Sequence, residues 1–542
     1  MSEISLEQIR ADRAALRQRW YREGVYASRT FADEMRAGAA RFPDSRMIFH
    51  SDEHPAEATL TEMHAQSLAL AGALRSLGLG AGDVVAIQVP NWLEGALVFQ
   101  AAMILGVVTL PIIHIYGPAE VSFVLRQSGA RAFICPARWR HIDYLARIAQ
   151  LDRASLPRLE HVVVVGDAAP SGGLTWDALR ARASQHFEPP RVSPDDVCML
   201  VYTSGTTADP KGVQHTHNSL LAEVRAMRRT LDAGASRSGT GLAAFPAGHI
   251  AGVLGLARLY VHGNSTVLMD AWNPDDAAAL IERHRIASSS GTPFFLIGLL
   301  DAAAKAERDI RCLDGYMVGA ASVPPALVER AERAGVRTYR SYGSSEHPTV
   351  TSGAPDEPLA KRATTDGRAT PNNEVRIVDD EGNDLPLGAP GEIVSRGPEL
   401  FVGYRDETLD LDSFLAGGWF RTGDVGVLDA EGYLAITDRK KDIIIRGGEN
   451  ISSKEVEDVL ARHPAVGEVA VVAAPDSRYG ERVCAFVIVR DGASLDLADV
   501  QKHFAAAGVA RQKTPERLER VRELPRTASG KVKKFELRKG LK

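Results

Sequence analysis

The sequence predicts an α/β protein with a large N-terminal domain of parallel-sheet α/β layers and a small barrel-like β part, followed by a small α+β C-terminal domain. Strand and helix patterns alternate through the first 200 residues, which is typical of a parallel sheet covered by helices. From about residue 373, short strands broken by glycines favour antiparallel hairpins or a small barrel. The last hundred residues combine two helices with two strands, so we expect domains at 1–439 and 440–542.

The alternation begins with a buried strand at 84–89. Asn91 is expected to cap the next helix, with Glu94 three residues further on. That helix should end near Gly106, and a strand at 107–113 should follow it.

Residues 95–113 are nearly all apolar and almost long enough to span a membrane. We interpret them as a buried helix that continues into a buried strand. Gly106 would end the helix, and the β-branched residues around Pro111 favour a strand. A membrane span is therefore not expected.

Further helices and strands are expected along the chain. A helix is expected at 117–130 and strands at 131–136, 161–167, 198–204, 373–383, 391–397 and 432–438. The C-terminal domain should contain helices at 453–462 and 497–507 and strands at 468–476 and 482–490.

Composition excludes several classes of protein. The chain has 542 residues, a net charge of −5 and a pI near 6.3, so it lacks the basic excess typical of nucleic-acid-binding proteins. Its cysteines are far apart, which disfavours a disulfide framework or a structural zinc site and fits a reducing cytoplasm. The first 20 residues lack the apolar segment of a secretory signal. The oligomeric state stays open, and a homodimer is one alternative.

The segment 202–213 follows a predicted strand and has the groups that bind a polyphosphate. It contains four hydroxyl side chains, those of Thr203, Ser204, Thr206 and Thr207. Amides beside Gly205 and the ammonium of Lys211 add further donors. It is not a Walker loop, because Pro210 replaces the second glycine and Gly212 replaces the final Ser or Thr. The alternative is a polar surface turn.

This segment resembles the phosphate loop of the adenylate-forming superfamily, which includes acyl-CoA synthetases, aryl-acid ligases, adenylation domains and beetle luciferases. Further segments match the family's motifs in order and spacing: 342–346 (YGSSE), 421–424 (RTGD), 438–442 (DRKKD), 447–450 (GGEN) and 525–531 (PRTASGK). The resemblance runs from about residue 30 to the end. Ala208 departs from the family's usual glycine, so the loop keeps its hydroxyls but loses backbone freedom.

The resemblance implies an AMP-forming acid:CoA ligase that uses ATP, Mg²⁺ and coenzyme A. A carboxylate is a poor electrophile, and joining it to AMP supplies a phosphate leaving group. The enzyme must bring the acid and the α-phosphate of ATP together, so cations and oriented donors have to offset their repulsion. Coenzyme A then attacks the acyl-adenylate and releases AMP.

Five alternatives are considered. An aryl-acid CoA ligase, or a ligase that loads a carrier protein, would use the same motifs. An amino-acid-activating domain is disfavoured because residues 245–252 contain no aspartate for the substrate ammonium. A luciferase-like oxidase is disfavoured because the C-terminal RKGLK is not a peroxisomal signal. A catalytically inactive nucleotide-binding protein is disfavoured by the joint presence of Lys531, Glu346 and Asp424.

The resemblance also assigns the nucleotide site. Thr203, Ser204, Gly205, Thr206, Thr207 and Lys211 would bind the β- and γ-phosphates. Glu346 would bind the magnesium ion. The expected catalytic residues are Lys531, Glu346 and Thr203. Adenine would lie between the ring of Tyr342 and the turn of Gly319, Ala320 and Ala321. Gly343 and Ser345, which follow Tyr342, would also belong to the nucleotide site. Asp424 and Arg439 would contact the ribose.

Lys531 is the residue expected to reach both the α-phosphate and the acid. A solvated C-terminal lysine is the alternative. In the family the C-terminal domain rotates between the two half-reactions, and Lys441 matches its hinge residue. After rotation, Gly447 and Gly448 would line the tunnel for the thiol. Ser452 and Ser453 depart from the family's usual residues.

The acyl group is expected beside Phe245, Gly248, His249 and Gly252. His249 would line or gate the pocket, or play a purely structural part. Gly248 stands where relatives often have a bulky residue, so small side chains should leave volume for an apolar group. We therefore expect a medium-sized monocarboxylic acid, straight-chain or alicyclic. Residues 288–295 should form another wall, and aryl acids stay open because residues 19–24 resemble part of the aryl-acid ligases.

Overall fold

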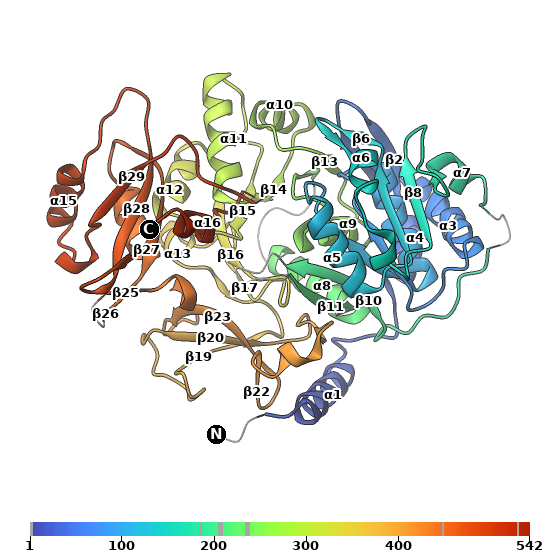
Figure 1. Ribbon diagram of the computed structural model, residues 1–542, viewed down its shortest axis with the longest axis horizontal. Coiled ribbons are helices and arrows are strands. Elements are labelled where there is room, and N and C mark those ends of the chain that lie inside the picture. Colours follow the sequence, from blue (N-terminus) through green and yellow to red (C-terminus); the bar gives the residue numbers. More distant parts are fainter. Residues whose placement is uncertain are drawn as a thin grey trace.

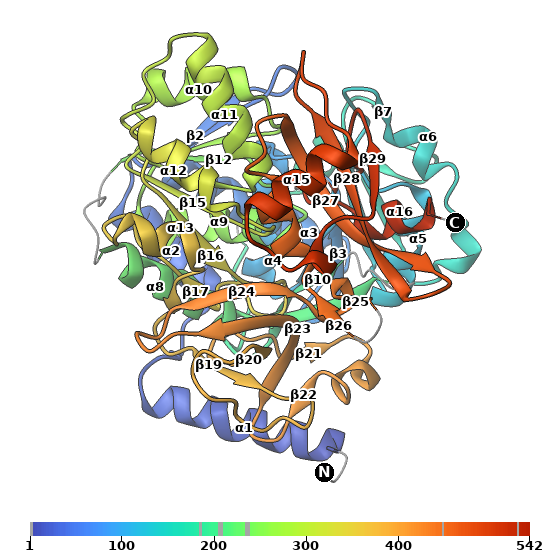
Figure 2. The same ribbon diagram turned by 90° about the vertical axis from the view of Figure 1, so that its left-hand side faces the viewer.

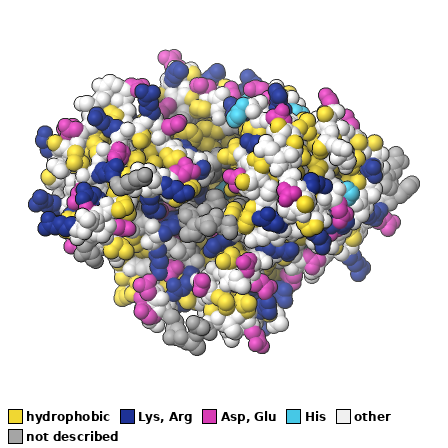
Figure 3. Space-filling view, viewed as in Figure 1, with side chains coloured by type: hydrophobic (Ala, Val, Ile, Leu, Met, Phe, Trp, Pro, Cys, Tyr) yellow, Lys and Arg dark blue, Asp and Glu magenta, His cyan; other side chains and the backbone are white. Residues whose placement is uncertain are grey.

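The computed structural model of the protein describes residues 4–183, 187–203, 210–232, 239–446, 449–527 and 530–541. Two large sheets with covering helices make up most of the N-terminal part, with the C-terminal elements at the left and a smaller sheet at the bottom (Figure 1). Lysine and arginine side chains are interspersed with acidic ones over the face seen in Figure 3. The α/β fold class is confirmed.

The first large sheet has eight strands in the order β21-β11-β10-β4-β3-β5-β8-β9. They are β3 (Val84–Ile87), β4 (Val108–Pro111), β5 (Ala132–Pro136), β8 (His161–Val165), β9 (Leu174–Thr175), β10 (Val197–Thr203), β11 (Lys211–Thr216) and β21 (Gly403–Tyr404). The strands from β10 to β9 run parallel, whereas β11 and β21 are antiparallel additions. Strands β3, β4 and β5 are buried throughout, which explains their continuous apolar sequence.

The second large sheet has nine strands in the order β18-β17-β16-β15-β14-β12-β13-β1-β2. They are β1 (Arg46–His50), β2 (Ala56–Thr59), β12 (Gly241–Ala243), β13 (Thr266–Met269), β14 (Ser288–Gly291), β15 (Gly315–Gly319), β16 (Thr338–Tyr342), β17 (Thr351–Ser352) and β18 (Arg368–Ala369). The six strands from β16 to β1 are parallel. Their carboxyl ends therefore lie at one edge.

Helices cover both sheets. In the N-terminal part they are α1 (Leu6–Arg22), α2 (Phe31–Arg41), α3 (Leu60–Ser76), α4 (Leu93–Leu105), α5 (Pro118–Ser128), α6 (Tyr144–Ile148), α7 (Trp176–Arg180), α8 (His217–Asp232), α9 (Ile250–His262), α10 (Pro274–His284), α11 (Pro293–Lys305), α12 (Pro325–Arg333) and α13 (Leu359–Thr364). Figure 2 shows α1 beneath the smaller sheet, and Arg19 of α1 pairs with Glu374 of that sheet (3.0 Å).

The apolar stretch 95–113 is a buried helix followed by a buried strand, as predicted. Helix α4 is buried from Gly95 to Leu105, and Gly106 ends it with a left-handed φ of 77°. Strand β4 then begins at Val108. Across the described ranges, no helix combines the length and apolar character needed to cross a membrane.

The predicted cap of α4 is wrong. Trp92 occupies the N-cap position, without a side-chain cap hydrogen bond. The buried amide of Asn91 donates instead to the carbonyl oxygens of Phe245 (3.0 Å) and Met269 (2.9 Å), and its oxygen accepts from the amide of Ala247 (2.8 Å). Asn91 satisfies three backbone groups of two distant segments, and these long-range hydrogen bonds override the local capping pattern.

Two smaller sheets complete the chain: one is antiparallel, and the C-terminal one is mixed because β28 and β29 run parallel. The smaller sheet at the bottom of Figure 1 contains antiparallel pairs of the strands β19 (Glu374–Val378), β20 (Gly391–Arg396), β22 (Phe414–Leu415), β23 (Trp419–Leu428) and β24 (Leu434–Arg439). The C-terminal sheet contains β25 (Ile444–Arg446), β26 (Glu449–Ile451), β27 (Val466–Asp476), β28 (Gly480–Val489) and β29 (Arg517–Arg520). Helices α14 (Ser453–Leu460), α15 (Leu497–Ala506) and α16 (Lys534–Lys539) accompany it. A short hairpin pairs β6 (Arg138–Trp139) with β7 (Ile142–Asp143).

Candidate active site

The site lies at the carboxyl edge of the nine-stranded sheet. Strands β12, β14, β15 and β16 are adjacent and parallel, so the residues that follow them share this edge. These residues are Phe245 to His249 after β12, Thr292 after β14, Ala320 and Ala321 after β15, and Gly343 to Glu346 after β16. Ligands of open α/β sheets bind outside the carboxyl ends of the strands.

Three of the expected nucleotide-binding residues contact one another. The hydroxyl of Tyr342 donates to one oxygen of Asp424 (2.7 Å), and the guanidinium of Arg439 pairs with the other (2.9 Å). Strand pairing places Asp424 directly opposite Arg439. Burial raises the pKa of Tyr342 well above its usual value, so its hydroxyl remains a donor.

Backbone geometry gives the adjacent turns their shape. Gly319 ends β15, where an added Cβ would lie 2.5 Å from the carbonyl oxygen of Ser341. Ala320 adopts a left-handed φ of 63°, which costs energy for a residue with a Cβ. At Gly343, an added Cβ would lie 1.9 Å from the carbonyl oxygen of Pro348, so only glycine lets this loop fold back on itself.

Glu346 is held by contacts that the sequence analysis missed. The hydroxyl of Tyr404 donates to its Oε1 (2.8 Å), and the amide of Phe401 donates to its carbonyl oxygen (2.8 Å). The ammonium of Lys211 lies over the Tyr404 ring, 5.1 Å from its centre. Tyr404 thus touches two expected site residues, yet in the sequence it is one aromatic residue among several in an ordinary strand.

The phosphate-binding segment is only partly described. Thr203 ends β10 and pairs with Lys211, which begins β11. Ser204, Gly205, Thr206, Thr207 and Ala208 lie outside the described residues, as do Gly447 and Gly448. The two described strand ends therefore bracket the expected loop from both sides.

Lys531 lies in a loop of the C-terminal part, between β29 and α16. Its loop is closed by two hydrogen bonds, from the Thr527 amide to the Lys531 carbonyl (2.8 Å) and from the Lys531 amide to the Thr527 hydroxyl (3.1 Å). Burial, and then the charge of Arg439, lower the pKa of Lys531 to about 8, against the opposing influence of Asp424 and Glu346. The charges of Arg439, Asp424 and Glu346 thus all act on the Lys531 ammonium.

His249 stands between these charges and a group of aromatic rings. Its ring stacks on Phe245, with centroids 5.7 Å apart, and accepts a hydrogen bond from the amide of Ala251 (3.3 Å) at the start of α9. Burial and the charge of Lys531 lower the pKa of His249 to about 3. Phe295 lies 5.9 Å from Phe245 and stacks on Trp272 at 4.4 Å. The neutral imidazole caps α9, which supports a structural part for His249. Its part in an acyl pocket stays a prediction.

Comparison with known proteins agrees with this geometry. The family model for the AMP-binding enzyme matches residues 35–405, and the model for the AMP-binding enzyme C-terminal domain matches residues 455–531. The chain is an adenylate-forming acid:CoA ligase.

Relatives of the ligase are named for different substrates. It is 34% identical to a medium-chain fatty-acid–CoA ligase of Escherichia coli, over 98% of this chain and 93% of that protein. It is 31% identical to a 2,3-dihydroxybenzoate-AMP ligase of Bacillus subtilis, over 97% and 96%. A crystal structure of an anthranilate CoA ligase with anthranoyl-AMP superposes with a TM-score of 0.86 at 26% identity, covering 95% of this chain and 97% of that one.

Gly248 of the ligase does not leave the free volume that was expected beside the acyl group. An added Cβ at Gly248 would lie 2.4 Å from the backbone nitrogen of Ile113, and one at Gly252 would lie 2.2 Å from the carbonyl oxygen of Pro246. Backbone therefore fills the space beside both glycines. The prediction that Gly248 widens the acyl pocket is wrong, because this glycine permits close packing of two chain segments.

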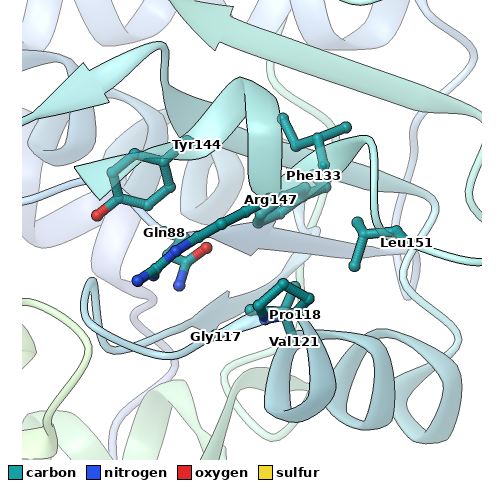
Figure 4. Close-up of a pocket in the computed structure, with 9 residues that line it drawn as sticks. Gln88, Gly117, Pro118, Val121, Phe133, Tyr144, Arg147 and Leu151 are labelled. Atoms are coloured by element: carbon teal, nitrogen blue, oxygen red, sulfur yellow. The ribbon is translucent and has the colours of Figure 1, made fainter.

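A small cavity of the ligase lies beside the segment 113–116, which packs against Gly248. The cavity has a volume of about 10 Å³, enough for roughly one water molecule, so it is not a substrate site. Figure 4 shows Gln88, Tyr144 and Arg147 side by side at its wall. All three donate to the backbone of residues 113–116: Gln88 to Ile113 (3.2 Å), Tyr144 to His114 (2.7 Å) and Arg147 to Tyr116 (2.8 Å).

Ser452 and Ser453 tie the C-terminal elements of the ligase to β24. The Ser452 hydroxyl donates to the carbonyl oxygen of Thr437 (2.7 Å) and caps α14. The Ser453 amide donates to the carboxylate of Asp438 (2.5 Å), while Lys534 donates to the Ser453 hydroxyl (2.8 Å). These hydrogen bonds hold the arrangement in which Lys531 faces the site.

Proposed function

We propose that this ligase acts on a medium-sized apolar monocarboxylic acid, straight-chain or alicyclic, and converts it through the acyl-adenylate to its CoA thioester. The observation that carries the proposal is that the loop of Lys531 packs, through Gly530, beside Thr292 at the sheet edge where Phe245, His249 and the contacting residues Tyr342, Asp424 and Arg439 also lie. A cation beside two carboxylates, next to apolar aromatic rings, suits an acid that meets a nucleotide phosphate.

In the first half-reaction, a carboxylate oxygen of the acid attacks the α-phosphorus of ATP. A new O–P bond forms, and the bond from phosphorus to pyrophosphate breaks. Lys531 offsets the charge of the two anions. Asp424 and Arg439 hold the ribose. Tyr342 and the turn of Gly319, Ala320 and Ala321 enclose adenine. The phosphates are bound by Thr203, Ser204, Gly205, Thr206, Thr207 and Lys211.

Glu346 suits a magnesium ion shared with the nucleotide. Within the described ranges, no group of three or more His, Cys, Asp or Glu residues could hold a metal ion by itself. Magnesium at nucleotide sites is usually held by one or two carboxylates together with phosphate oxygens, so a single glutamate fits. The ion would supply positive charge to the phosphates, and the Tyr404 hydrogen bond would orient the carboxylate that holds it.

In the second half-reaction, the thiol of CoA attacks the acyl carbon and AMP leaves. We propose that residues 440–542 rotate between the steps, about Lys441. This residue is exposed in the short turn Lys440–Asp442, between β24 and β25. Rotation would withdraw Lys531 and present the segment of Gly447 and Gly448 to the thiol.

The choice of acid rests on the walls of the site. Phe245, Phe295 and Trp272 offer apolar surface, and neutral His249 offers no fixed charge for an amino group. We propose that the reaction takes place in the cytoplasm, where ATP and CoA are available. The free thiols of Cys135, Cys198, Cys312 and Cys484 would stay reduced there.

Acid-dependent ATP–pyrophosphate exchange tests the proposal, followed by thioester formation with CoA. The panel is acetate, hexanoate, octanoate, cyclohexanecarboxylate, benzoate and an amino acid. The proposal expects the highest kcat/KM for one of the six- to eight-carbon aliphatic acids. A maximum at benzoate would support the aryl-acid alternative, and a maximum at acetate or the amino acid would contradict the apolar pocket.

A further inference from the structure

Thr292 occupies a central position at the carboxyl edge of the nine-stranded sheet. It follows β14, and β14 lies between β12 and β15. Thr292 therefore lies between the segment that contains Phe245 and His249 and the turn that contains Ala320. Neither the family motifs nor the mechanism above gives this residue a part.

The hydroxyl of Thr292 is buried without a hydrogen-bond partner among the described residues. Thr292 is the N-cap of α11, a position where threonine usually accepts a hydrogen bond from the first turn, but its side chain makes no cap bond. Its side chain is fully buried, and Oγ1 contacts no hydrogen-bond partner in the part of the chain that the structure describes. A buried hydroxyl without a partner is unfavourable, which points to a partner supplied by a ligand.

The loop that carries Lys531 packs on this hydroxyl. A Cβ added to Gly530 would lie 3.0 Å from Thr292 Oγ1 and 3.2 Å from the Phe294 ring. The guanidinium of Arg526, at the other end of the loop, lies over the same ring, 4.9 Å from its centre. Thr292 Oγ1 is therefore next to the residue that precedes Lys531, whose charge also reaches His249.

We propose that Thr292 Oγ1 donates a hydrogen bond to the carboxylate of the acid substrate, beside Lys531. This rests on the proposed function. One carboxylate oxygen attacks phosphorus, and the other becomes the carbonyl oxygen of the acyl-adenylate. A hydrogen bond from Thr292 to the second oxygen would turn the first toward the α-phosphate, and it would complete the bonding of a buried hydroxyl.

The test compares Thr292→Val, which removes the hydroxyl at nearly constant shape, with Thr292→Ser, which keeps it. Thr338→Val is the matched control, because Thr338 Oγ1 is also buried and unpaired among the described residues, but it begins β16 at the opposite edge of the sheet. Pyrophosphate exchange is measured with the best acid of the panel, and binding of that acid alone is measured by calorimetry.

Thr292→Val should lower kcat/KM for the acid roughly 10- to 100-fold, the loss typical of a hydrogen bond to a charged group, and weaken acid binding in the calorimeter. The KM for ATP should change by less than about twofold. Thr292→Ser should recover most of the activity, and Thr338→Val should match the wild type. If valine does not fold at this site, serine against alanine gives the same comparison.

Two results would overturn the proposal: unchanged acid kinetics in Thr292→Val, or an equal loss for acid and ATP, which would indicate that Thr292 only packs against the Lys531 loop. Failure of the proposed function is distinguishable, because the wild type itself would then exchange pyrophosphate with none of the acids.

Discussion

Tyr404 donates a hydrogen bond to Glu346 across 2.8 Å, while the ammonium of Lys211 lies over the same ring. One side chain thus connects the proposed magnesium ligand with the lysine of the phosphate-binding segment. Burial and the charge of Glu346 raise the pKa of Tyr404, so the phenol remains a donor at physiological pH.

Tyr404→Phe should weaken magnesium binding while leaving the ring under Lys211. Without the phenol, the carboxylate of Glu346 loses the group that orients it, and we expect the half-saturating Mg²⁺ concentration to rise roughly tenfold. Magnesium titration of the exchange reaction measures this, with Mn²⁺ binding in the presence of ATP as a readout independent of turnover. An unaltered titration would show that Tyr404 only packs.

The pH dependence of adenylation should reflect Lys531. Its pKa of about 8 lies below the usual lysine value, so the ammonium is charged below pH 8 and neutral above it. The kcat/KM for ATP, which reports the free enzyme, should therefore fall as pH rises through about 8. A Lys531→Arg variant, whose guanidinium stays charged, should lack this alkaline decrease. The same decrease in both proteins would assign it to another group.

Gly248→Ala should destabilise the fold and should not simply shorten the preferred acid. The added methyl group would lie 2.4 Å from the backbone of Ile113, in the segment 113–116 to which three side chains donate hydrogen bonds. We expect a loss of about 1–3 kcal/mol of unfolding free energy. Gly255→Ala, in α9 with no atom within 4 Å of the added Cβ, is the control and should be neutral or stabilising. Equal stability of the two variants would argue against close packing at 248.

Lys441→Pro should separate the two half-reactions. Proline fixes φ near −65° and is tolerated in the first turn of a helix, so the present arrangement should form while rotation is blocked. Pyrophosphate exchange should persist, and thioester formation should drop by orders of magnitude; Lys441→Ala should retain both. A parallel decline of both steps in the proline variant, at an unchanged melting temperature, would remove Lys441 as the hinge.

The sequence predicted the elements best where the signal is local. The buried strands at 84–87 and 132–136 and the break at Gly106 follow from apolar runs and a left-handed glycine. Motifs in a characteristic order predicted a shared site; Asp424 and Arg439 do pair, and the charges of both act on Lys531.

What the sequence missed depends on contacts between distant segments. Asn91 carries a good capping pattern but binds the backbone 154 residues away at Phe245. Gly248 is small because Ile113 approaches it, and no local pattern reveals that neighbour. Tyr404 and Thr292 gain their significance only from Glu346 and Gly530, which strand order and loop packing bring to them.

The central claim is that Lys531 serves the first half-reaction of an acid:CoA ligase. The most direct measurement compares wild type with Lys531→Ala in two assays: acid-dependent ATP–pyrophosphate exchange, and thioester formation from a supplied acyl-adenylate and CoA. We predict that the variant nearly loses exchange and largely keeps thioester formation. Full exchange by the variant, or equal loss of both activities in a folded protein, would contradict the account.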